Sequence, residues 1–368
     1  MMMKKKILLF GGDGYLGWPI AMYLANKGHS VTICDNFNKR KWELEIGVKP
    51  LIPISTLHER VSLWNKNQKE SIFLKIGDVT NQRFVYDLFS TKPDVIIHGA
   101  DQPSSPFSMK GINTAQVTQY NNVASGLNIL FAIKKYCPSA NYIRIGANAL
   151  VDYRSSDGKN VGPPCSYYEL SRLNDCNNIF FAVTNWKLTA NIVNTGVVYN
   201  DQTKETMLSS KLRTSFHYDR VFGTIVNRFC VQAVSGMDLT VYGDGNQKCA
   251  LSSLESAVEN IAQIAERDPV KKGKFEIINR FEAVKTVNDI SGEVIDAASN
   301  LGIKIDCQSI NNPRMEMVGE RNQSIARYEL NDKSNGLKDI DELLRKIVEH
   351  KNNILPYTIM PIIKWIYD

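Results

Sequence analysis

The fold is decided near the N-terminus, by Lys6-Ile7-Leu8-Leu9-Phe10-Gly11-Gly12-Asp13-Gly14-Tyr15-Leu16-Gly17. A short apolar run, typical of a buried strand, passes directly into glycines at Gly11, Gly14 and Gly17. This spacing predicts a strand, a tight turn and a helix whose N-terminal amides can bind the pyrophosphate of a dinucleotide. Because a glycine triplet alone is a weak signal, the prediction depends on the residues that follow.

The residues after the glycines complete a nucleotide-binding unit. Apolar Ile20, Tyr23 and Leu24 predict a helix that ends at Gly28, and residues 31–34 predict the next strand. Asp35 stands at the end of that strand, where an acidic side chain can hold the ribose hydroxyls of a bound dinucleotide. Strand, glycines, helix, strand and acid in this order favour dinucleotide binding over a chance glycine-rich turn.

Composition excludes several function classes. The 368 residues are 43% hydrophobic and 22% charged with a net charge of +6, which is ordinary for a globular protein. The basic clusters at 4–6 and 39–41 are too short to predict a nucleic-acid surface, and no apolar run has the length of a signal peptide or a membrane span. Seven scattered cysteines without a Cys-x-x-Cys pair predict neither a metal site nor disulfides. We therefore expect a cytoplasmic protein that binds no nucleic acid, membrane or metal.

The first half of the chain alternates predicted strands with predicted helices. The strands are at 71–76, 94–98, 141–145 and 188–194, and the helices are at 57–64, 82–89, 115–136 and 168–183. This alternation predicts an α/β fold, a Rossmann-type doubly wound parallel sheet with ligands at the carboxyl ends of its strands.

The alternation weakens from about Gly196. Predicted elements there are helices around 222–231, 254–265, 287–301 and 337–349, with strands at 239–242 and 274–278. We predict a dinucleotide-binding Rossmann domain over residues 1–195. A smaller mixed α/β lobe is predicted over residues 196–368, with segments that return to the first domain.

Several segments, in order along nearly the whole chain, carry a resemblance to a known family. They are the glycine stretch through Trp18, Asp35-Asn36, and residues 54–60, 104–109, 118–123, 130–134, 196–199, 222–233, 312–314 and 359–361. The chain resembles the extended short-chain dehydrogenase/reductase superfamily of NAD-dependent epimerases and dehydratases, and most closely its UDP-sulfoquinovose synthase type. In that type NAD lies over the glycine loop and UDP-glucose lies between the lobes. The sugar C4 hydroxyl is oxidised transiently, and sulfite is added at C6.

The resemblance implies positions for both ligands. The cofactor positions are Gly11, Gly14, Tyr15, Leu16, Gly17, Asp35, Asn36, Lys39, Arg40, Asp78, Val79, Asn122, Tyr168 and Arg172. The positions for a UDP-sugar substrate in the smaller lobe and cleft are Gln102, Asn194, Asn227, Tyr242, Lys248 and Arg314. NAD is favoured over NADP because Asp35 would repel a 2′-phosphate, although Lys39 and Arg40 are basic. A homodimer through the helices at 115–136 and 168–183 is usual for such proteins.

The sequence departs from the family at the position of the catalytic pair. Tyr168 matches the general base of a Tyr-x-x-x-Lys motif, but Arg172 stands in place of the lysine. Arginine keeps the positive charge that lowers the pKa of the phenol, whereas its planar fork changes the geometry. The i, i+4 spacing still places both side chains on one face of a helix.

Other family residues are also replaced. Ala147 stands where the family has Ser or Thr, Leu150 where close relatives have glutamate, and Glu169 where sulfoquinovose synthases have histidine. Cys249 and Pro103 stand at positions of expected arginines. We therefore expect no sulfoquinovose synthase activity, since the carboxylate of Glu169 would also repel sulfite.

Three functions stay open. The first is an NAD-dependent nucleotide-sugar epimerase, dehydratase or synthase-type enzyme, with Tyr168 as acid/base, Arg172 as its partner and Asn148 as helper; Ser166 and Tyr167 are alternative helpers. The second is a catalytically impaired homologue that binds NAD or a nucleotide sugar in a regulatory or partner-binding role. The third is NAD-dependent redox chemistry on a substrate that is not a sugar.

Overall fold

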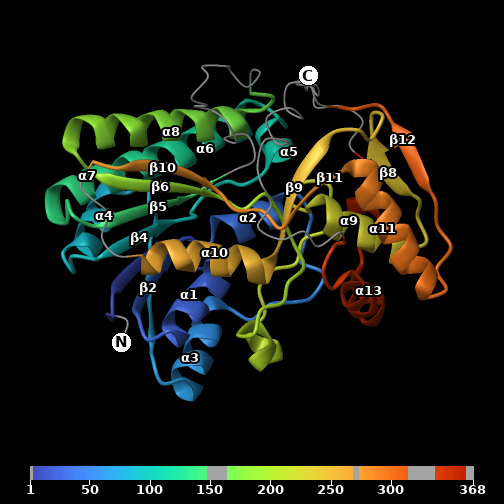
Figure 1. The fold of residues 1–368 in the computed structure, drawn as a ribbon, viewed down its shortest axis with the longest axis horizontal. Helices are drawn as coiled ribbons and strands as arrows, with labels where there is room; N and C mark the ends of the chain where they lie inside the picture. The colour runs from blue at the N-terminus through green and yellow to red at the C-terminus, as the bar shows by residue number, and fades with distance from the viewer. Residues whose placement is uncertain (1–2, 147–163, 268–272, 314–335, 362–368) are drawn as a thin grey trace.

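A parallel sheet of seven strands forms the centre of the molecule. The computed structural model describes residues 3–146, 164–267, 273–313 and 336–361. The strand order is β10-β6-β5-β4-β1-β2-β3, and every pairing is parallel (Figure 1). The strands are β1 (Lys6–Phe10), β2 (Ser30–Asp35), β3 (Ile72–Ile76), β4 (Val95–His98), β5 (Asn141–Ile145), β6 (Thr189–Asn194) and β10 (Phe275–Asn279). The predicted Rossmann-type sheet is confirmed.

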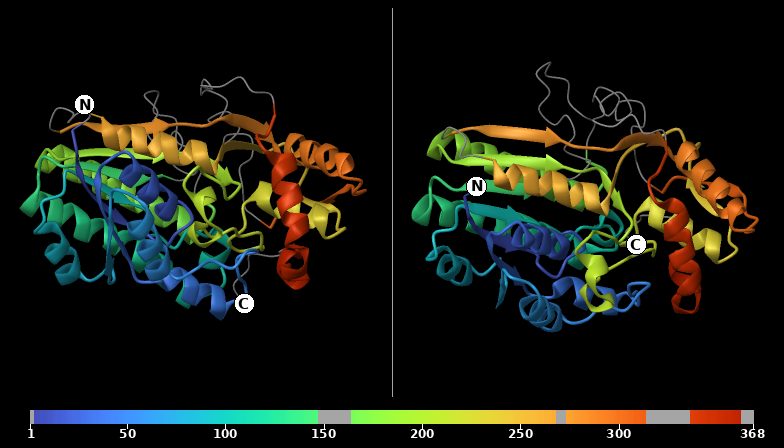
Figure 2. Two further views of the ribbon diagram at one scale, coloured as in Figure 1. Left: turned by 90° about the horizontal axis from the view of Figure 1, so that it is seen from below. Right: turned by 60° about the horizontal axis from the view of Figure 1, so that its bottom comes forward.

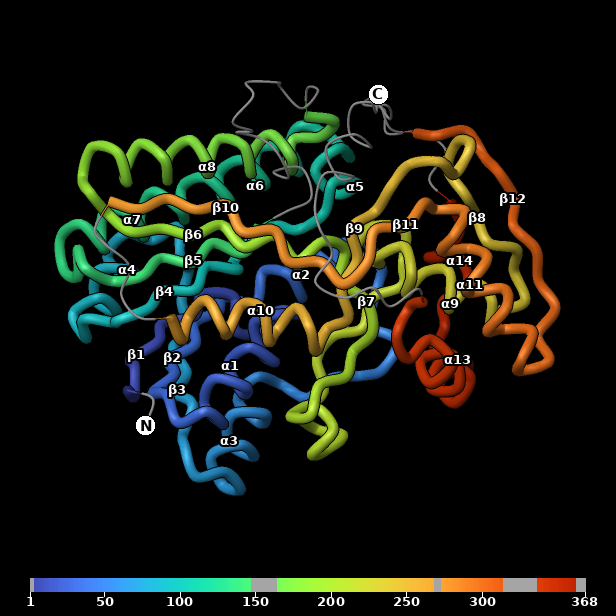
Figure 3. The backbone as a smooth tube through the Cα atoms, viewed as in Figure 1, coloured from blue at the N-terminus to red at the C-terminus, as the bar shows by residue number. Residues whose placement is uncertain are grey.

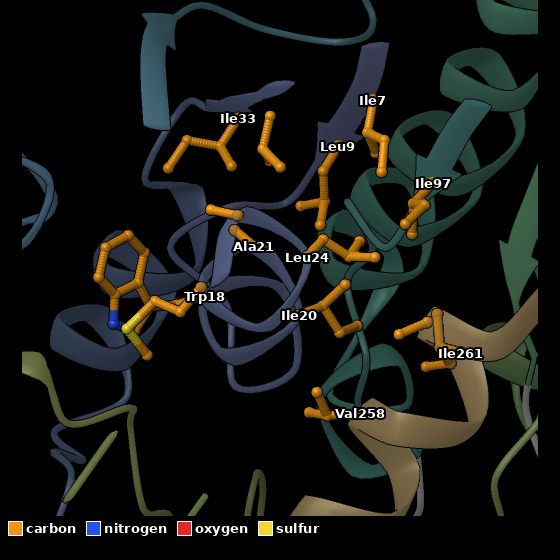
Figure 4. Close-up of a cluster of buried hydrophobic side chains, with 14 of the residues drawn as sticks. Ile7, Leu9, Trp18, Ile20, Ala21, Leu24, Ile33, Ile97, Val258 and Ile261 are labelled. Carbon is orange, nitrogen blue, oxygen red and sulfur yellow. The ribbon is translucent and has the colours of Figure 1, made fainter. Parts of the chain in front are cut away.

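Helices cover both faces of this sheet. One layer contains α1 (Gly17–Asn26), α3 (Leu57–Asn67) and α10 (Leu254–Glu266), and the other contains α4 (Gln82–Phe89), α7 (Ser125–Tyr136) and α8 (Tyr167–Trp186). Side chains alternate along β1, so that Ile7 and Leu9 face the first layer while Leu8 and Phe10 face the second. Figure 4 shows the first of these cores, where Ile7 and Leu9 lie among side chains of α1 and α10.

The sheet is completed by a strand from far along the chain. β10 pairs with β6, placing Ile277 opposite Ile192, and the two strands lie side by side in both views of Figure 2. The preceding helix α10 packs Val258 and Ile261 into the core of the first layer. Segments beyond residue 250 therefore belong to the sheet and its first helical layer, and the predicted domain division at residue 195 stays a prediction.

The smaller lobe surrounds a second core. Its strands are β7 (Val197–Tyr199), β8 (Leu239–Tyr242), β9 (Lys248–Ser253), β11 (Ala283–Thr286) and β12 (Cys307–Ile310), arranged as sheets β11-β9-β7 and β12-β8. Its helices are α9 (Ile225–Val234), α11 (Val287–Asn300), α13 (Ile340–Glu349) and α14 (Pro356–Ile359). Figure 3 shows α9, α11 and α13 together, and their apolar faces form one buried cluster.

The predicted helix over 115–136 is interrupted by a wider turn. It consists of α6 (Ile112–Gln119), a π-helical turn (Tyr120–Ala124) and α7. A π turn changes the phase of the side chains that follow it. In α7, Ile129, Leu130 and Ile133 are buried, whereas Leu127 is exposed.

Two short helices lie in the connections that follow β2 and β4, namely α2 (Asn38–Glu45) and α5 (Ser105–Ser108). The remaining helical turns of the described chain are single 3₁₀ turns at Thr206–Leu208, Ser210–Leu212 and Lys351–Asn353. In the described ranges, no helix has both the length and the apolar character needed to cross a bilayer. All seven cysteines lie in these ranges and are present as thiols.

Candidate active site

The sheet topology creates a crevice between β1 and β4. The chain leaves β1 toward β2 and β3 on one side and then crosses to β4 on the other, and ligands of such sheets bind at this reversal. Gly11 ends β1 with a φ of +91°, and a Cβ at this position would lie 2.8 Å from the carbonyl carbon of Gly99. Only glycine therefore lets the ends of the two strands meet below the crevice.

A cavity opens at this point and extends to the smaller lobe. Of the predicted site residues, those that line it are Gly11, Gly14, Tyr15, Leu16, Gly17, Asp35, Asn36, Lys39, Arg40, Val79, Tyr168 and Asn227. Residues that the sequence did not single out also line it, among them Asp13, Trp42, Glu43, Asp101, Asn121, Gly146, Ser215, His217, Phe222 and Thr224. The glycine loop, the tyrosine and part of the smaller lobe thus share one cavity.

Asp35 is fixed at the glycine-loop end of the cavity. Its Oδ2 accepts the N–H of Asp13 at 2.8 Å, and its Oδ1 accepts the N–H of Phe37 at 2.7 Å. Burial raises the pKa of this carboxyl to about 6, against the lowering effect of these backbone hydrogen bonds. Each carboxylate oxygen keeps a lone pair that can accept a ribose hydroxyl.

Arg40 is neutralised within the cavity wall. Its Nε lies 2.5 Å from Asp13 Oδ2 and its Nη2 lies 2.9 Å from Asp13 Oδ1, and Arg60 donates to the same carboxylate. A guanidinium engaged in this two-point ion pair is a poor partner for a 2′-phosphate. The ion pair therefore agrees with the preference for NAD that was expected from Asp35.

A row of hydrogen-bonded side chains at the cavity wall connects α2 to the smaller lobe. Lys39 Nζ donates to Glu43 Oε1 at 2.6 Å, His217 Nε2 lies 2.9 Å from the same oxygen, and His217 Nδ1 lies 3.2 Å from Asp219 Oδ2. Burial opposes ionisation of Glu43, but the His217 hydrogen bond and the Lys39 charge lower its pKa to about 2. Sequence reasoning missed Glu43 and His217, because no spacing rule links residues so far apart.

Tyr168 enters the cavity from the first turn of α8. Ser166 caps this helix by accepting the N–H of Glu169 at 3.1 Å, and Glu169 Oε2 accepts the N–H of Cys165 at 2.8 Å. Burial raises the pKa of the Tyr168 phenol more than the charge of Arg172 lowers it. Ser166 and Glu169 thus fix the start of the helix that carries the predicted base.

Arg172 lies behind residues that line the cavity. Its side chain is 1% exposed, its Nη1 donates to Asp101 Oδ2 at 2.6 Å, and its Nη2 donates to the carbonyl oxygen of Ile145. Within the described chain, Arg172 does not line the cavity, whereas Asp101 does. The structure therefore gives Arg172 a carboxylate partner that i, i+4 spacing could not reveal.

Two amides predicted at the site instead hold the loop after β4. Asn122 is buried, and its Oδ1 accepts the N–H of Gln102 at 2.8 Å while its Nδ2 donates to Ser171 Oγ at 2.9 Å. The Gln102 side chain is buried beside Thr118 Oγ1 at 3.2 Å. The π-helical turn brings Asn121 to the cavity in their place.

Four other predicted residues do not line the cavity in the described chain. Asp78 accepts Asn36 Nδ2 at 2.9 Å and so positions a lining residue, and Asn194 joins β6 to β10 through Asn279 Oδ1 at 2.7 Å. The Tyr242 ring lies 5.2 Å from the guanidinium carbon of Arg228, and Lys248 pairs with Thr286 in the β9–β11 ladder. Asn148 and Arg314, together with Ala147 and Leu150, fall outside the described residues.

Comparisons with known proteins agree with this geometry. The family model described as NAD dependent epimerase/dehydratase family matches residues 7–174. The chloroplastic UDP-sulfoquinovose synthase of Spinacia oleracea is 33% identical, over 98% of this chain and 79% of that protein. The UDP-sulfoquinovose synthase of Sulfolobus acidocaldarius is 30% identical, over 98% of this chain and 97% of that protein.

Solved structures share the fold. The UDP-glucuronic acid 4-epimerase of Bacillus cereus, in complex with UDP-glucuronic acid and NAD, superposes with a TM-score of 0.63 at 16% identity, over 94% of this chain and 99% of that chain. The UDP-glucose 4-epimerase of Thermotoga maritima, with UDP-glucose, superposes with a TM-score of 0.64 at 15% identity, over 94% and 98% of the two chains.

Proposed function

The chain belongs to the NAD dependent epimerase/dehydratase family, and we propose that it is an NAD-dependent enzyme that modifies a nucleotide sugar, with a UDP-sugar as substrate. The observation that carries this proposal is the continuous cavity from the glycine loop past Tyr168 to the smaller lobe. One end of this cavity has the features of a dinucleotide site, and the other end has room and polar groups for a second ligand.

The glycine-loop end fits NAD. Gly14 and Gly17 border the N-terminus of α1, whose unpaired amides favour a pyrophosphate. Asp35 offers a fixed carboxylate for the adenosine ribose, and Val79 offers an apolar wall for adenine. When bound, the oxidised nicotinamide ring would accept the two electrons removed from a substrate carbon.

The residues that the smaller lobe contributes to the cavity support a phosphorylated ligand. The hydroxyls of Ser215 and Thr224 are buried at the cavity and have no hydrogen-bond partner within the described chain. Thr224 is also the N-cap of α9, a helix whose N-terminus favours negative charge. Because buried hydroxyls without partners are costly, these groups suit the diphosphate of a nucleotide sugar.

In the reaction that we propose, Tyr168 takes the proton of a sugar hydroxyl as the carbon that bears it is oxidised. Return of the electrons after rearrangement at the neighbouring carbons gives an epimerase, dehydratase or synthase outcome. The alternative is a catalytically impaired homologue that binds NAD or a nucleotide sugar in a regulatory or partner-binding role.

A panel of UDP-sugars separates the proposal from this alternative. The purified protein with NAD is expected to give a transient absorbance of reduced nicotinamide and a new UDP-sugar with at least one member. UDP-glucose with sulfite forms a separate arm, in which no sulfonated product is expected. Binding of NAD and UDP-sugars without any product would contradict the enzyme and support the impaired homologue.

Asp35 is expected to make NAD binding depend on pH. We predict that NAD affinity falls as the pH drops through about 6, because protonation of this carboxyl removes an acceptor for the ribose hydroxyls. Asp35→Asn should weaken NAD binding by about tenfold or more and remove most of this dependence, as expected for a hydrogen bond to a charged group. Calorimetric titration of NAD from about pH 5 to about pH 8 measures both effects, because this range brackets the raised pKa of Asp35.

We also propose a homodimer that uses the outer face of α7 and α8. Phe131 and Phe181 are 45% and 56% exposed there, and the Phe131 ring lies 4.8 Å from that of Trp186. Adjacent exposed aromatic side chains of this kind mark an interaction surface.

Phe181→Glu is expected to convert a dimer to a monomer, because it places a charge in the apolar contact. Sedimentation velocity measures the change. Phe73→Glu is the matched control, since Phe73 is 53% exposed on the edge strand β3. A monomeric wild type, or an unaltered dimer in Phe181→Glu, would contradict this surface.

A further inference from the structure

A cluster of four charged side chains lies against the Tyr168 end of the cavity. Arg144 and Arg172 are each 1% exposed and Asp175 is 1% exposed, whereas Asp101 is 11% exposed and lines the cavity. Two arginines and two aspartates balance in charge, as buried ions require.

Within this cluster, Asp101 binds both arginines at once. Its Oδ1 accepts Arg144 Nη2 at 2.6 Å and its Oδ2 accepts Arg172 Nη1 at 2.6 Å. Arg172 Nη2 donates to the Ile145 carbonyl, so both terminal nitrogens of this guanidinium are engaged. Arg172 can reach the cavity only if it gives up its carboxylate partner.

The position of Asp101 does not depend on Arg172. Arg144, from β5, also donates to the carbonyl of His98 at 2.8 Å and to Asp175 Oδ2 at 2.5 Å, so it is fixed at three points. The backbone next to Asp101 is held by Asn122, which binds both the N–H and the carbonyl of Gln102 at 2.8 and 3.1 Å. Other residues therefore hold Asp101 in the position in which its Oδ2 accepts the hydrogen bond from Arg172.

Tyr168 lies one helical turn before Arg172, and the charges of this cluster affect the pKa of its phenol. Burial is the largest cause that raises the pKa of its phenol; Arg172 and Arg144 lower this pKa, and Asp101 and Glu169 raise it. The effect of the arginine that replaces the family lysine is thus opposed by the carboxylate that binds it.

We propose that Asp101 is a positioning residue that holds the Arg172 guanidinium out of the cavity, so that Tyr168 works beside a neutralised arginine rather than a free cation. The catalytic meaning of this inference rests on the proposed function, but its physical content concerns the phenol alone. If the cluster only joined β4, β5 and α8, removal of the Asp101 carboxylate would leave the Tyr168 titration unshifted.

The experiment follows the ionisation of Tyr168 directly. Tyrosine labelled with ¹³C at the ring carbon that bears the hydroxyl is incorporated into the full chain, and Tyr168→Phe assigns the signal. Asp101→Asn is expected to shift the Tyr168 titration to lower pH, because it removes the charge that opposes Arg172. In the double variant Asp101→Asn/Arg172→Gln the titration is expected to return toward higher pH, because the positive charge of Arg172, which lowers the pKa of Tyr168, is also removed.

Asp175→Asn is the matched control. It removes a carboxylate from the same cluster, whose Oδ2 lies 4.0 Å from Arg172 Nη1, but Asp175 does not line the cavity in the described chain, and Arg172 keeps its shorter bond to Asp101. Its effect on the Tyr168 titration is expected to be smaller than that of Asp101→Asn. Equal shifts in these two variants, or no shift in Asp101→Asn, would overturn the inference.

Asp101→Ser keeps the inference testable if Asp101→Asn does not fold. Arg172→Gln is expected to shift the Tyr168 titration to higher pH, because Arg172 is the largest charge that lowers this pKa, but by less in the wild type than in the Asp101→Ser background, where no carboxylate opposes Arg172. Equal shifts in the two backgrounds would overturn the proposal. Because no step of these titrations needs turnover, they can succeed even if no UDP-sugar is converted. Conversely, turnover with an unshifted Asp101→Asn titration would support the proposed function and reject the role of Asp101.

Discussion

Tyr168→Phe is expected to reduce turnover of the UDP-sugar by about a hundredfold to ten-thousandfold, the usual contribution of a general acid–base group. Tyr168 is the residue of α8 that lines the cavity in the described chain, and phenylalanine removes its hydroxyl while keeping the ring. Since the dinucleotide is held mainly at the glycine loop, the affinity for NAD should change little.

Single-turnover measurement of nicotinamide reduction with an active UDP-sugar tests this prediction, and calorimetry measures the NAD affinity. Tyr167→Phe provides the control, because Tyr167 is the neighbouring tyrosine, is 39% exposed and does not line the cavity in the described chain. A rate in Tyr168→Phe that equals the rate in Tyr167→Phe would remove Tyr168 from the mechanism.

The sheet could be predicted because its strands follow a local rule. Each parallel strand is a short apolar run followed by a turn, and a strand such as β5 was predicted with the bounds that it has. The strands β7, β9, β11 and β12 were not predicted. They are short, and pairings such as Ala283 with Leu251 are set by the tertiary structure rather than by any pattern within the strand.

The residues of the site also divide into those that the sequence predicted and those that it could not predict. Asp35 was predicted from its place at the end of a strand, and Val79 and Tyr168 were predicted from the family resemblance; all three line the cavity. The orientation of Arg172 was not predictable, because it is decided by Asp101 on another segment of the chain. Helix spacing shows which side chains share a face, but it does not show which buried carboxylate a flexible guanidinium will bind.

Glu43 and His217 show the same limit. Their contact of 2.9 Å joins α2 to the smaller lobe, and neither residue lies in a recognisable motif. The fold brings a carboxylate and an imidazole from distant parts of the chain within hydrogen-bond distance. Such groups are found from the cavity and not from the sequence.

The glycine loop gives the second large prediction. Gly17 is the first residue of α1, and a Cβ there would lie 1.9 Å from the carbonyl oxygen of Gly11. Neither atom belongs to a flexible side chain, so Gly17→Ala must displace the backbone of the loop or of the helix. We expect a loss of about 3 kcal/mol or more in the free energy of unfolding, at the upper end for overpacking. NAD binding should also be lost, because the amides of the displaced loop no longer converge on the pyrophosphate.

Gly292→Ala separates this steric effect from the general effect of alanine in a helix. Gly292 lies within α11, and a Cβ there would meet no atom within 4 Å. Alanine should stabilise this helix by about 0.5–1 kcal/mol, because glycine loses more backbone entropy on folding. Chemical denaturation and NAD titration of both variants measure the contrast. If Gly17→Ala unfolded at the same denaturant concentration as the wild type and bound NAD normally, the close packing of α1 on the end of β1 could not be what makes the dinucleotide site.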